Sequence, residues 1–285
     1  MIVSKTHSDN MKAKLKAVSP SKSLHIDEEV WTYLVAECVL SQIKKGDDTL
    51  FRLLVGQAYQ PSDQLGLEVQ PIGPRMGEGN THLDMALGSI AARKGTEAGI
   101  AYAEHSGQDT VSQDIVCFVE AKFLSDISTK VSNNPFRDQM TRVIENLLTF
   151  QSDDGSCKQP NRMVFTLLTP RAFRRKPYVR LYGYLFEEYL VDLHRLDTHL
   201  FERLDYVDST FPKRNDPKKW HYPNIEANIA KLALRWVTYE EIFKTFLSSK
   251  GFSEDDLKSV GLDDLVSLDS TCRLDVMKLI WKHLP

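Results

Sequence analysis

The sequence predicts an α/β protein in which helices flank a mixed β-sheet and a mostly helical region follows. Three observations indicate this class. Up to residue 170, short apolar runs typical of buried strands alternate with segments whose apolar residues recur every three or four positions. Beyond residue 176 the helical spacing prevails. The composition, 285 residues with 42% hydrophobic and 26% charged side chains, is that of a globular chain with a large core.

Three regions are expected along the chain. Residues 1–22 are rich in Lys and Ser and lack apolar periodicity, which predicts a flexible tail. Residues 23–175 should form the α/β core, and residues 176–285 a helical extension packed on it. In that extension, Thr238 and Glu241 predict a capping box at the start of a helix.

Local patterns predict the elements of the core. Asp27, followed by two glutamates, should begin an amphipathic helix that ends near Lys45. Asn134-Pro135 should begin a second helix, with an apolar face running from Phe136 to Leu148. The polar residues 91–113 should form an excursion or hairpin between two strands. Apolar runs predict strands at residues 50–59, 65–72, 82–90, 114–123 and 162–170.

Two charges interrupt the apolar run DIVCFVEAKFLSD, which spans Asp114 to Asp126. Glu120 and Lys122 lie two positions apart, so in a strand they share one face. They come at the carboxyl end of the strand, where a cleft can form. Because burying an unpaired charge costs several kcal/mol, their presence here indicates a function.

Asp84 is a second carboxylate inside an apolar strand, between Leu83 and Met85. Two carboxylates bind a hard divalent cation such as Mg²⁺ through oxygen. A nearby ammonium group can orient a water molecule or help to deprotonate it, and can offset charge on a phosphate. If the two acids and the lysine converge, the chain has the side chains needed for phosphodiester hydrolysis.

These residues resemble the motif of the PD-(D/E)XK nuclease superfamily, an acid on one strand followed by Asp/Glu-x-Lys on the next. The match consists of Asp84 in HLDMALG and Glu120-Ala121-Lys122 in VEAKF, and it covers roughly residues 27–170. The resemblance implies a restriction-endonuclease-like fold with a helix–strand–strand–strand–helix–strand core. It also implies that Asp84, Glu120 and the Ala121 carbonyl bind Mg²⁺ or Mn²⁺, while Lys122 serves the attacking water.

The same resemblance suggests further site residues. An acid of the first helix often joins the metal, and Glu37 or Glu29 would fill that role, with nothing in the spacing to choose between them. Gln139, on the helix after the lysine strand, would point at the site. The expected activity is that of a Mg²⁺-dependent endonuclease acting on DNA. The alternative is a nuclease-fold module that has lost catalysis and binds nucleic acid or a protein partner.

Each of these features also has a simpler explanation. Glu120 and Lys122 would form an ordinary ion pair at a surface strand end, worth less than ~1 kcal/mol. A lone histidine such as His82 is more often structural than a metal ligand. Gln139 and Arg142 would belong to a solvated helix face, and Ser125-Asp126 would cap the loop after the strand.

The acid-x-lysine triplet is not specific by itself. Asp216-Pro217-Lys218 and Asp256-Leu257-Lys258 match it too, but the first lies in a polar loop and the second in a short helix. Only the triplet at Glu120 follows another acid-bearing strand. The strand context therefore carries the prediction.

Two basic stretches are candidate phosphate contacts. The first directly follows the last core strand, where loops of open sheets border the active cleft. The second, residues 212–222, is better explained as ordinary surface charge. In the first stretch we expect backbone contacts from Arg171, Arg174, Arg175, Lys176 and Arg180.

The remaining expectations concern compartment and partners. The four cysteines are widely spaced and form no metal or disulfide pattern, and no run approaches the ~20 apolar residues of a membrane span, which predicts a cytoplasmic protein. The net charge of −3 excludes a uniformly basic surface but permits a local basic patch. Nucleic acid, DNA above all, is the expected partner, and a homodimer is left open. The aromatic stripe of Tyr178, Tyr182 and Tyr189 is expected to be core rather than a base-stacking platform.

Overall fold

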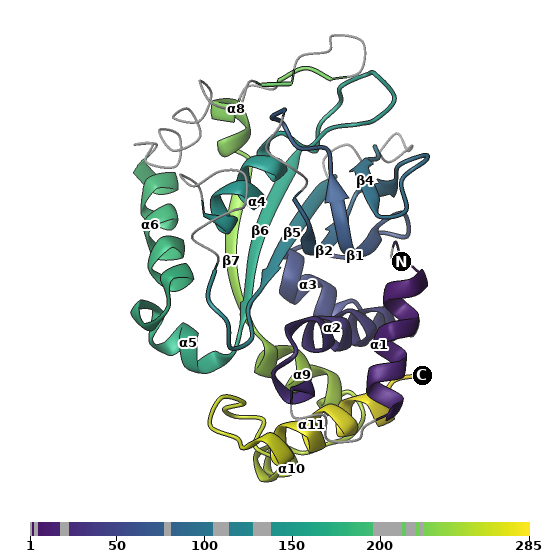
Figure 1. Cartoon of the computed structure of the whole chain (residues 1–285), viewed down its shortest axis with the longest axis vertical. Coiled ribbons are helices and arrows are strands. Elements are labelled where there is room, and N and C mark those ends of the chain that lie inside the picture. The colour runs from purple at the N-terminus through teal and green to yellow at the C-terminus, as the bar shows by residue number, and fades with distance from the viewer. Residues whose placement is uncertain are drawn as a thin grey trace.

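The computed structural model describes residues 2, 5–17, 23–76, 81–104, 114–127, 138–195, 213–214, 220–222 and 225–285. Within them, one mixed β-sheet of seven strands carries helices on both faces (Figure 1). The α/β class with a flanked mixed sheet and C-terminal helices is therefore confirmed.

The elements follow one another along the chain with short connections. The helices are α1 (Lys5–Ala17), η1 (Leu24–Ile26), α2 (Glu28–Ile43), α3 (Thr49–Val55), α4 (Gln139–Leu148), α5 (Arg171–Arg175), η3 (Pro177–Val179), α6 (Leu181–Arg195), α8 (Ile225–Ile229), α9 (Tyr239–Ser248), α10 (Glu254–Ser259) and α11 (Ser270–His283). The strands are β1 (Gln64–Pro71), β2 (Leu83–Gly88), β3 (Ile90–Ala92), β4 (Gly99–Tyr102), β5 (Ile115–Ala121), β6 (Arg162–Thr169) and β7 (Leu232–Thr238).

The sheet has the order β3-β4-β1-β2-β5-β6-β7. Strands β1, β2 and β5 pair antiparallel, whereas β5, β6 and β7 run parallel. The parallel strands place the carboxyl ends of β5, β6 and β7 at one end of the sheet, and α5 and α9 start there. Because β5 is central, its charged end lies among several elements.

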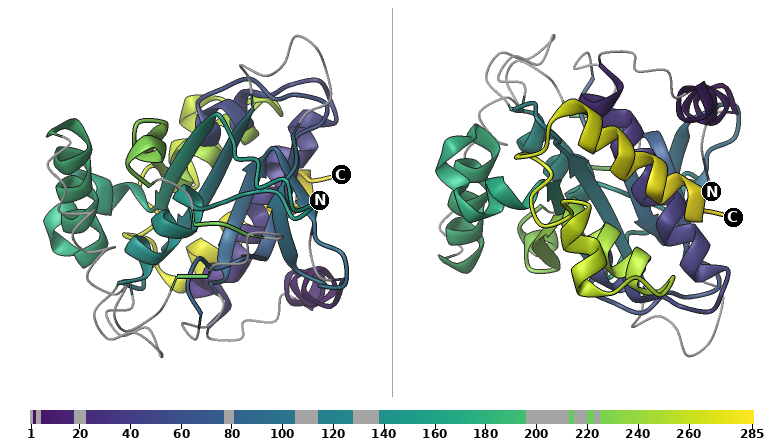
Figure 2. Two further views of the ribbon diagram at one scale, coloured as in Figure 1. Left: turned by 90° about the horizontal axis from the view of Figure 1, so that it is seen from above. Right: turned by 90° about the horizontal axis from the view of Figure 1, so that it is seen from below.

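Two apolar cores cover the two faces of the sheet. On one face, α1, α2, α3, α9 and α11 pack together, with Trp31 stacked on Phe123 at a ring-centroid distance of 4.6 Å. On the other face, α4, α6 and α8 pack on Phe118 and Phe165. The views from above and below show α6 to one side of the sheet and α11 beneath it (Figure 2).

Most predicted strands are confirmed, but residues 50–59 do not form one. They contribute to helix α3, because Leu50, Phe51, Leu54 and Val55 repeat at helical spacing and are buried together. Helix α4 begins at Gln139 with Asp138 as its N-cap. The expected start at Asn134-Pro135 and Phe136 lies outside the described residues.

The region boundaries also need correction. Residues 5–17, expected in a flexible tail, form α1, and Met11 and Leu15 are buried against the core. The C-terminal region is helical as expected and has the Thr238–Glu241 capping box, but it also supplies strand β7. Because β7 pairs with β6 along its whole length, this region completes the sheet of the core.

Two further findings concern the chain as a whole. No described helix is long and apolar enough to cross a membrane. The four cysteines, Cys38, Cys117, Cys157 and Cys272, are unbridged, and the first two are buried. Burial raises the pKa of both buried thiols, so these two cysteines act as apolar core residues.

Candidate functional site

Neighbouring strands bring the two predicted acids level. The register that pairs Met85 with Val119 and Ala86 with Phe118 sets Asp84 opposite Glu120. Side chains directly opposite one another in an antiparallel pair point to the same face of the sheet. Oδ2 of Asp84 also accepts a hydrogen bond from the Ala121 backbone N–H at 2.7 Å. The convergence predicted for the two carboxylates is therefore present.

Glu120 is buried with few hydrogen-bond donors around it. Its side chain is 0% exposed, and neither carboxylate oxygen accepts a well-directed hydrogen bond from a described residue. The ammonium of Lys122 lies 2.8 Å from Oε1 as an ion pair. A buried carboxylate normally has its oxygens satisfied, so Glu120 retains the capacity to bind another positive group.

Lys122 is surrounded by oxygen atoms. Besides Glu120, its Nζ donates to the Ala121 carbonyl at 2.9 Å and to Oε1 of Glu28 at 3.0 Å. The Lys122 side chain is 6% exposed, so this is not the surface ion pair of the simpler explanation. The lysine is held in place at the carboxyl end of β5.

The helix acid at the site is Glu28, which the sequence did not single out. Glu28 is the first residue of α2, where its second oxygen accepts from the Phe123 N–H at 2.9 Å and from the Ser125 hydroxyl at 2.6 Å. The N-cap Asp27 fixes this turn by accepting from the Val30 N–H. Helix α2 thus presents a carboxylate to Lys122 and to the segment after it.

The charges of these residues shift one another's pKa values. Burial, and next the charge of Asp84, raise the pKa of Glu120. Burial also raises the pKa of Asp84, against the opposing effect of Lys122. For Lys122, burial lowers the pKa, but the charges of Glu120, Asp84 and Glu28 outweigh it and the pKa ends above its usual range. The cluster therefore holds more negative charge than its single lysine neutralises.

Glu68 on β1 adds a further acid that the sequence analysis did not predict. It is level with Asp84 in the β1–β2 register and has a φ of 50°, in the left-handed region. Burial and the charge of Asp84 raise its pKa to about 7. Its own flanking residues, Leu67 and Val69, resemble those of Asp84, and this similarity was the available signal.

Other predicted site residues lie elsewhere or make other contacts. Glu37 interacts with Tyr33 and Cys38 in the middle of α2, so it is not the helix acid of this site. Glu29 pairs with Lys14 at 3.5 Å. Its charge reaches Asp84.

The helix and histidine predictions have mixed outcomes. Gln139 opens α4 half-buried, with no contact to the acids among the described residues. Arg142 is buried and donates to the Thr81 hydroxyl at 3.2 Å, so it does not belong to a solvated face. His82 is exposed and hydrogen-bonds Gln70 at 3.0 Å, in agreement with a structural role.

The first basic stretch forms α5 and the turn after it, at the same end of the sheet as Lys122. Arg171 lies 3.8 Å from Asp263, and Arg174 pairs with Glu241 at 2.9 Å. Arg175 and Lys176 are exposed and have no partner among the described residues. Arg180 packs over the Phe173 ring at 4.6 Å. The first two arginines thus anchor α5, and the next two cations remain available.

Asp126 joins this basic region to the site. Its carboxylate accepts from the N–H groups of Leu181 and Tyr182 at 2.9 and 3.3 Å, so it caps α6. The second basic stretch is described only in part. Its Arg214 donates to the Gly73 carbonyl at 3.2 Å, and Lys213 packs on the Tyr222 ring.

The metal prediction can be compared with the donor groups present. Within the described ranges, no three His, Cys, Asp or Glu side chains gather closely enough to hold a metal ion by themselves. The groups that remain for a cation are Asp84, Glu120 and the Ala121 carbonyl. All three are hard oxygen donors.

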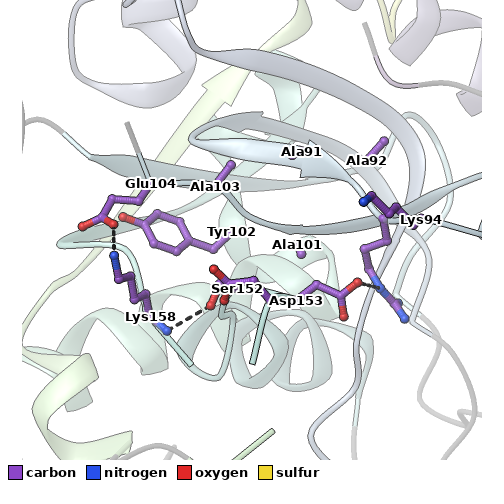
Figure 3. A pocket seen from close by; sticks show the side chains of 12 residues that line it. Ala91, Ala92, Lys94, Ala101, Tyr102, Ala103, Glu104, Ser152, Asp153 and Lys158 are labelled. Atoms are coloured by element: carbon purple, nitrogen blue, oxygen red, sulfur yellow. Dashed lines mark hydrogen bonds and ion pairs between the residues drawn. The ribbon is translucent and has the colours of Figure 1, made fainter. Parts of the chain in front are cut away.

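A cavity of about 600 Å³ lies away from these acids, against the β3–β4 hairpin (Figure 3). Its rim charges are paired with one another: Arg93 with Asp153 at 3.6 Å, and Lys158 with Glu104. Its walls are mostly small residues of the hairpin. The cavity shares no residue with the candidate site.

No protein-family model matches the chain, and no match is found among curated proteins or solved structures. Function must therefore be inferred from the placement of Asp84, Glu120, Lys122 and Glu28 alone.

Proposed function

We propose that this chain is a divalent-cation-dependent nuclease of the PD-(D/E)XK type that hydrolyses phosphodiester bonds in DNA. The observation that carries the proposal is the pairing of Asp84 with Glu120 on one face of β2 and β5, with Lys122 held beside them. The order α2, β1, β2, β5, α4, β6 also supports a restriction-endonuclease-like core, with the β3–β4 hairpin inserted before β5.

The donor groups fit a hard cation such as Mg²⁺ or Mn²⁺. Asp84, Glu120 and the Ala121 carbonyl would hold it, and because they are few, water and phosphate oxygens would complete its coordination, as Mg²⁺ prefers. The excess negative charge that raises the pKa values of both acids favours a bound cation. When bound, such an ion polarises a phosphate oxygen and lowers the pKa of a water molecule.

Lys122 acts as a charged donor rather than as a base. Because neighbouring acids raise its pKa, it keeps its proton near neutral pH. A protonated ammonium can orient a water molecule and offset charge that develops on a phosphate, but it cannot remove a proton. Glu28 is a positioning residue, since it holds the ammonium from the side of α2.

A second function is favoured by one observation. Three oxygens already surround the Lys122 ammonium, which has three hydrogens to donate. If they stay engaged, none remains for water or phosphate. The chain would then be a nuclease-fold module that binds nucleic acid or a protein without cutting.

A cleavage assay on supercoiled plasmid separates the two functions. The wild type should nick the plasmid in Mg²⁺ and not in EDTA, whereas Asp84→Asn and Glu120→Gln should lose at least ~10³-fold in rate. Glu28→Gln should lower kcat more than it raises KM, because it acts through Lys122. Binding in Ca²⁺ should persist in all three variants.

The matched control is Lys258→Ala. Lys258 belongs to the triplet Asp256-Leu257-Lys258, which has the same spacing but lies on α10 in an exposed turn. This variant should cut like the wild type. Plasmid binding without any Mg²⁺-dependent nicking by the wild type would reject the nuclease and favour the binding module.

A further inference from the structure

Exposed aromatic and aliphatic side chains gather on η3 and α6. Among the described residues, six large hydrophobic side chains are exposed, and four of them lie between positions 178 and 191. Tyr178 is 74% exposed and Tyr184 is 53% exposed. The stripe expected to be core is therefore divided: Tyr182 and Tyr189 are buried, but Tyr178 faces solvent. Two tyrosine rings on one short segment require an explanation other than packing.

Unpaired positive charges accompany these rings. Arg175 and Lys176 precede Tyr178 and are exposed without a partner among the described residues, whereas Arg171 and Arg174 are committed to acids. Arg180, next along the chain, is half-buried on the ring of Phe173. We call the set Arg175, Lys176, Tyr178, Arg180 and Tyr184 the tyrosine–arginine surface.

The acids near this surface leave its charge positive. Asp126 uses its carboxylate to cap the first turn of α6. Glu187 and Glu188 are half-buried and lie one turn beyond Tyr184, toward the other end of the helix. The part that carries Arg175, Lys176 and Tyr178 therefore has cations next to an exposed ring.

The tyrosine–arginine surface is fixed beside the candidate site. Helix α5 directly follows β6, and β6 pairs Leu168 with Ala121 of the site strand. The capping of α6 by Asp126 attaches the helix four residues beyond Lys122. A carbonyl contact also holds the turn, because a Cβ at Gly183 would come within 2.1 Å of the Pro177 oxygen. In Figure 1, α5 and α6 stand together at one side of the sheet.

We propose that the tyrosine–arginine surface binds unpaired nucleotides of a nucleic-acid strand, with bases stacked on Tyr178 and Tyr184 and phosphates held by Arg175 and Lys176. This inference rests on the proposed nuclease function and narrows its substrate to nucleic acid with a single-stranded segment. A duplex hides the faces of its bases except at its ends, so exposed rings gain nothing from it. Uncompensated cations interleaved with aromatic rings are the usual platform for single strands.

Binding can be measured without cleavage, in Ca²⁺, by the anisotropy of dye-labelled strands. The probes are an oligothymidylate, a base-free deoxyribose-phosphate strand of the same length, and a blunt duplex. Tyr178→Ala and Tyr184→Ala should each weaken oligothymidylate binding about tenfold and leave the other two probes unchanged. Tyr178→Phe should restore binding, because it keeps the ring. Val191→Ala, an exposed position farther along α6, is the matched control.

The outcomes separate this inference from the proposed function. An equal decrease for the oligothymidylate and the base-free strand would overturn stacking, and so would unchanged binding in both alanine variants. Binding of no probe by the wild type would overturn it as well. If oligothymidylate binding depends on the rings but Asp84→Asn cuts plasmid like the wild type, the inference holds and the proposed catalytic site fails. Normal cutting without dependence on the rings gives the reverse.

Discussion

Glu120 and Lys122 depend on each other because both are buried. A charge left alone in such a place costs several kcal/mol, whereas a pair recovers much of that cost. Glu120 also faces Asp84, so its ionised form is disfavoured from two directions. The lysine is therefore needed for stability as well as for chemistry, and the two roles can be separated experimentally.

Lys122→Met should lower the free energy of unfolding by ~3–5 kcal/mol, because it leaves Glu120 buried without its counter-ion. Glu120→Gln should cost less, since it removes a charge that Asp84 repels. The double variant should be more stable than Lys122→Met alone. Urea unfolding monitored by circular dichroism measures the three values. Additive effects in this double-mutant cycle would show that the pair is not coupled.

At the scale of elements, α5 separates anchoring arginines from available cations. Arg171 and Arg174 pair with Asp263 and Glu241, whereas Arg175 and Lys176 have no partner among the described residues. The basic residues predicted to contact phosphate therefore differ in how free they are to do so. The salt dependence of binding measures this difference.

For a duplex in Ca²⁺, the Arg175→Ala/Lys176→Ala variant should reduce the slope of log K against log salt by ~0.9 for each phosphate that is no longer neutralised. Arg171→Ala/Arg174→Ala removes the same formal charge but should change the slope less, because those arginines already face acids. Fluorescence titration over a range of salt concentrations gives both slopes. The reverse order would mean that the ion pairs open on binding.

The turn between η3 and α6 depends on a residue without a side chain. Gly183→Ala would place a Cβ 2.1 Å from the Pro177 carbonyl oxygen, so the turn must move. We expect the free energy of unfolding to fall by about 1–3 kcal/mol, seen as a lower melting temperature. Tyr184→Ala, the next position and exposed, should change stability by less than ~0.5 kcal/mol. Equal melting temperatures would show that the turn adapts without cost.

At the scale of the whole molecule, Glu240 joins the sheet to the C-terminal helices. Its carboxylate is buried and accepts from the Arg171 N–H of α5 at 2.7 Å and from the Leu265 N–H at 3.1 Å. Burial nevertheless raises its pKa to about 7. The junction between α5, α9 and the segment before α11 therefore contains a titratable group.

Glu240 should make stability depend on pH. Because its folded pKa lies above the unfolded value of 4.5, the unfolded state binds fewer protons between those two values. Stability should fall as pH rises from about 4.5 to about 7, by at most ~3 kcal/mol from this group. Asp84, Glu120 and Glu68 act in the same direction. Urea unfolding of Glu240→Gln at several pH values should show a smaller slope, and an unchanged slope would exclude Glu240 as a source.

The acid-bearing strands are predictable from the sequence because their signal is local. Asp84 and Glu120 stand out as charges within apolar runs, and alternation fixes their faces. Glu28 cannot be chosen in this way, because the end of α2 that meets Lys122 depends on how the helix packs. Strand β7 escapes prediction since Leu232–Thr238 has polar residues on both faces, and it is a strand through its pairing with β6. Residues 50–59 show the opposite case, in which an apolar run predicts a strand but its helical spacing decides the structure.

The left-handed backbone at Glu68 bears on how such a chain evolves. Glycine or asparagine fits a φ of 50° with less strain, and a glutamate there costs about 1–2 kcal/mol. Selection for stability alone would replace it, so Glu68→Gly should raise the melting temperature. If the same variant cuts DNA more slowly, the strained glutamate is a trade of stability for activity. If activity is unchanged, position 68 is simply open to stabilising substitution.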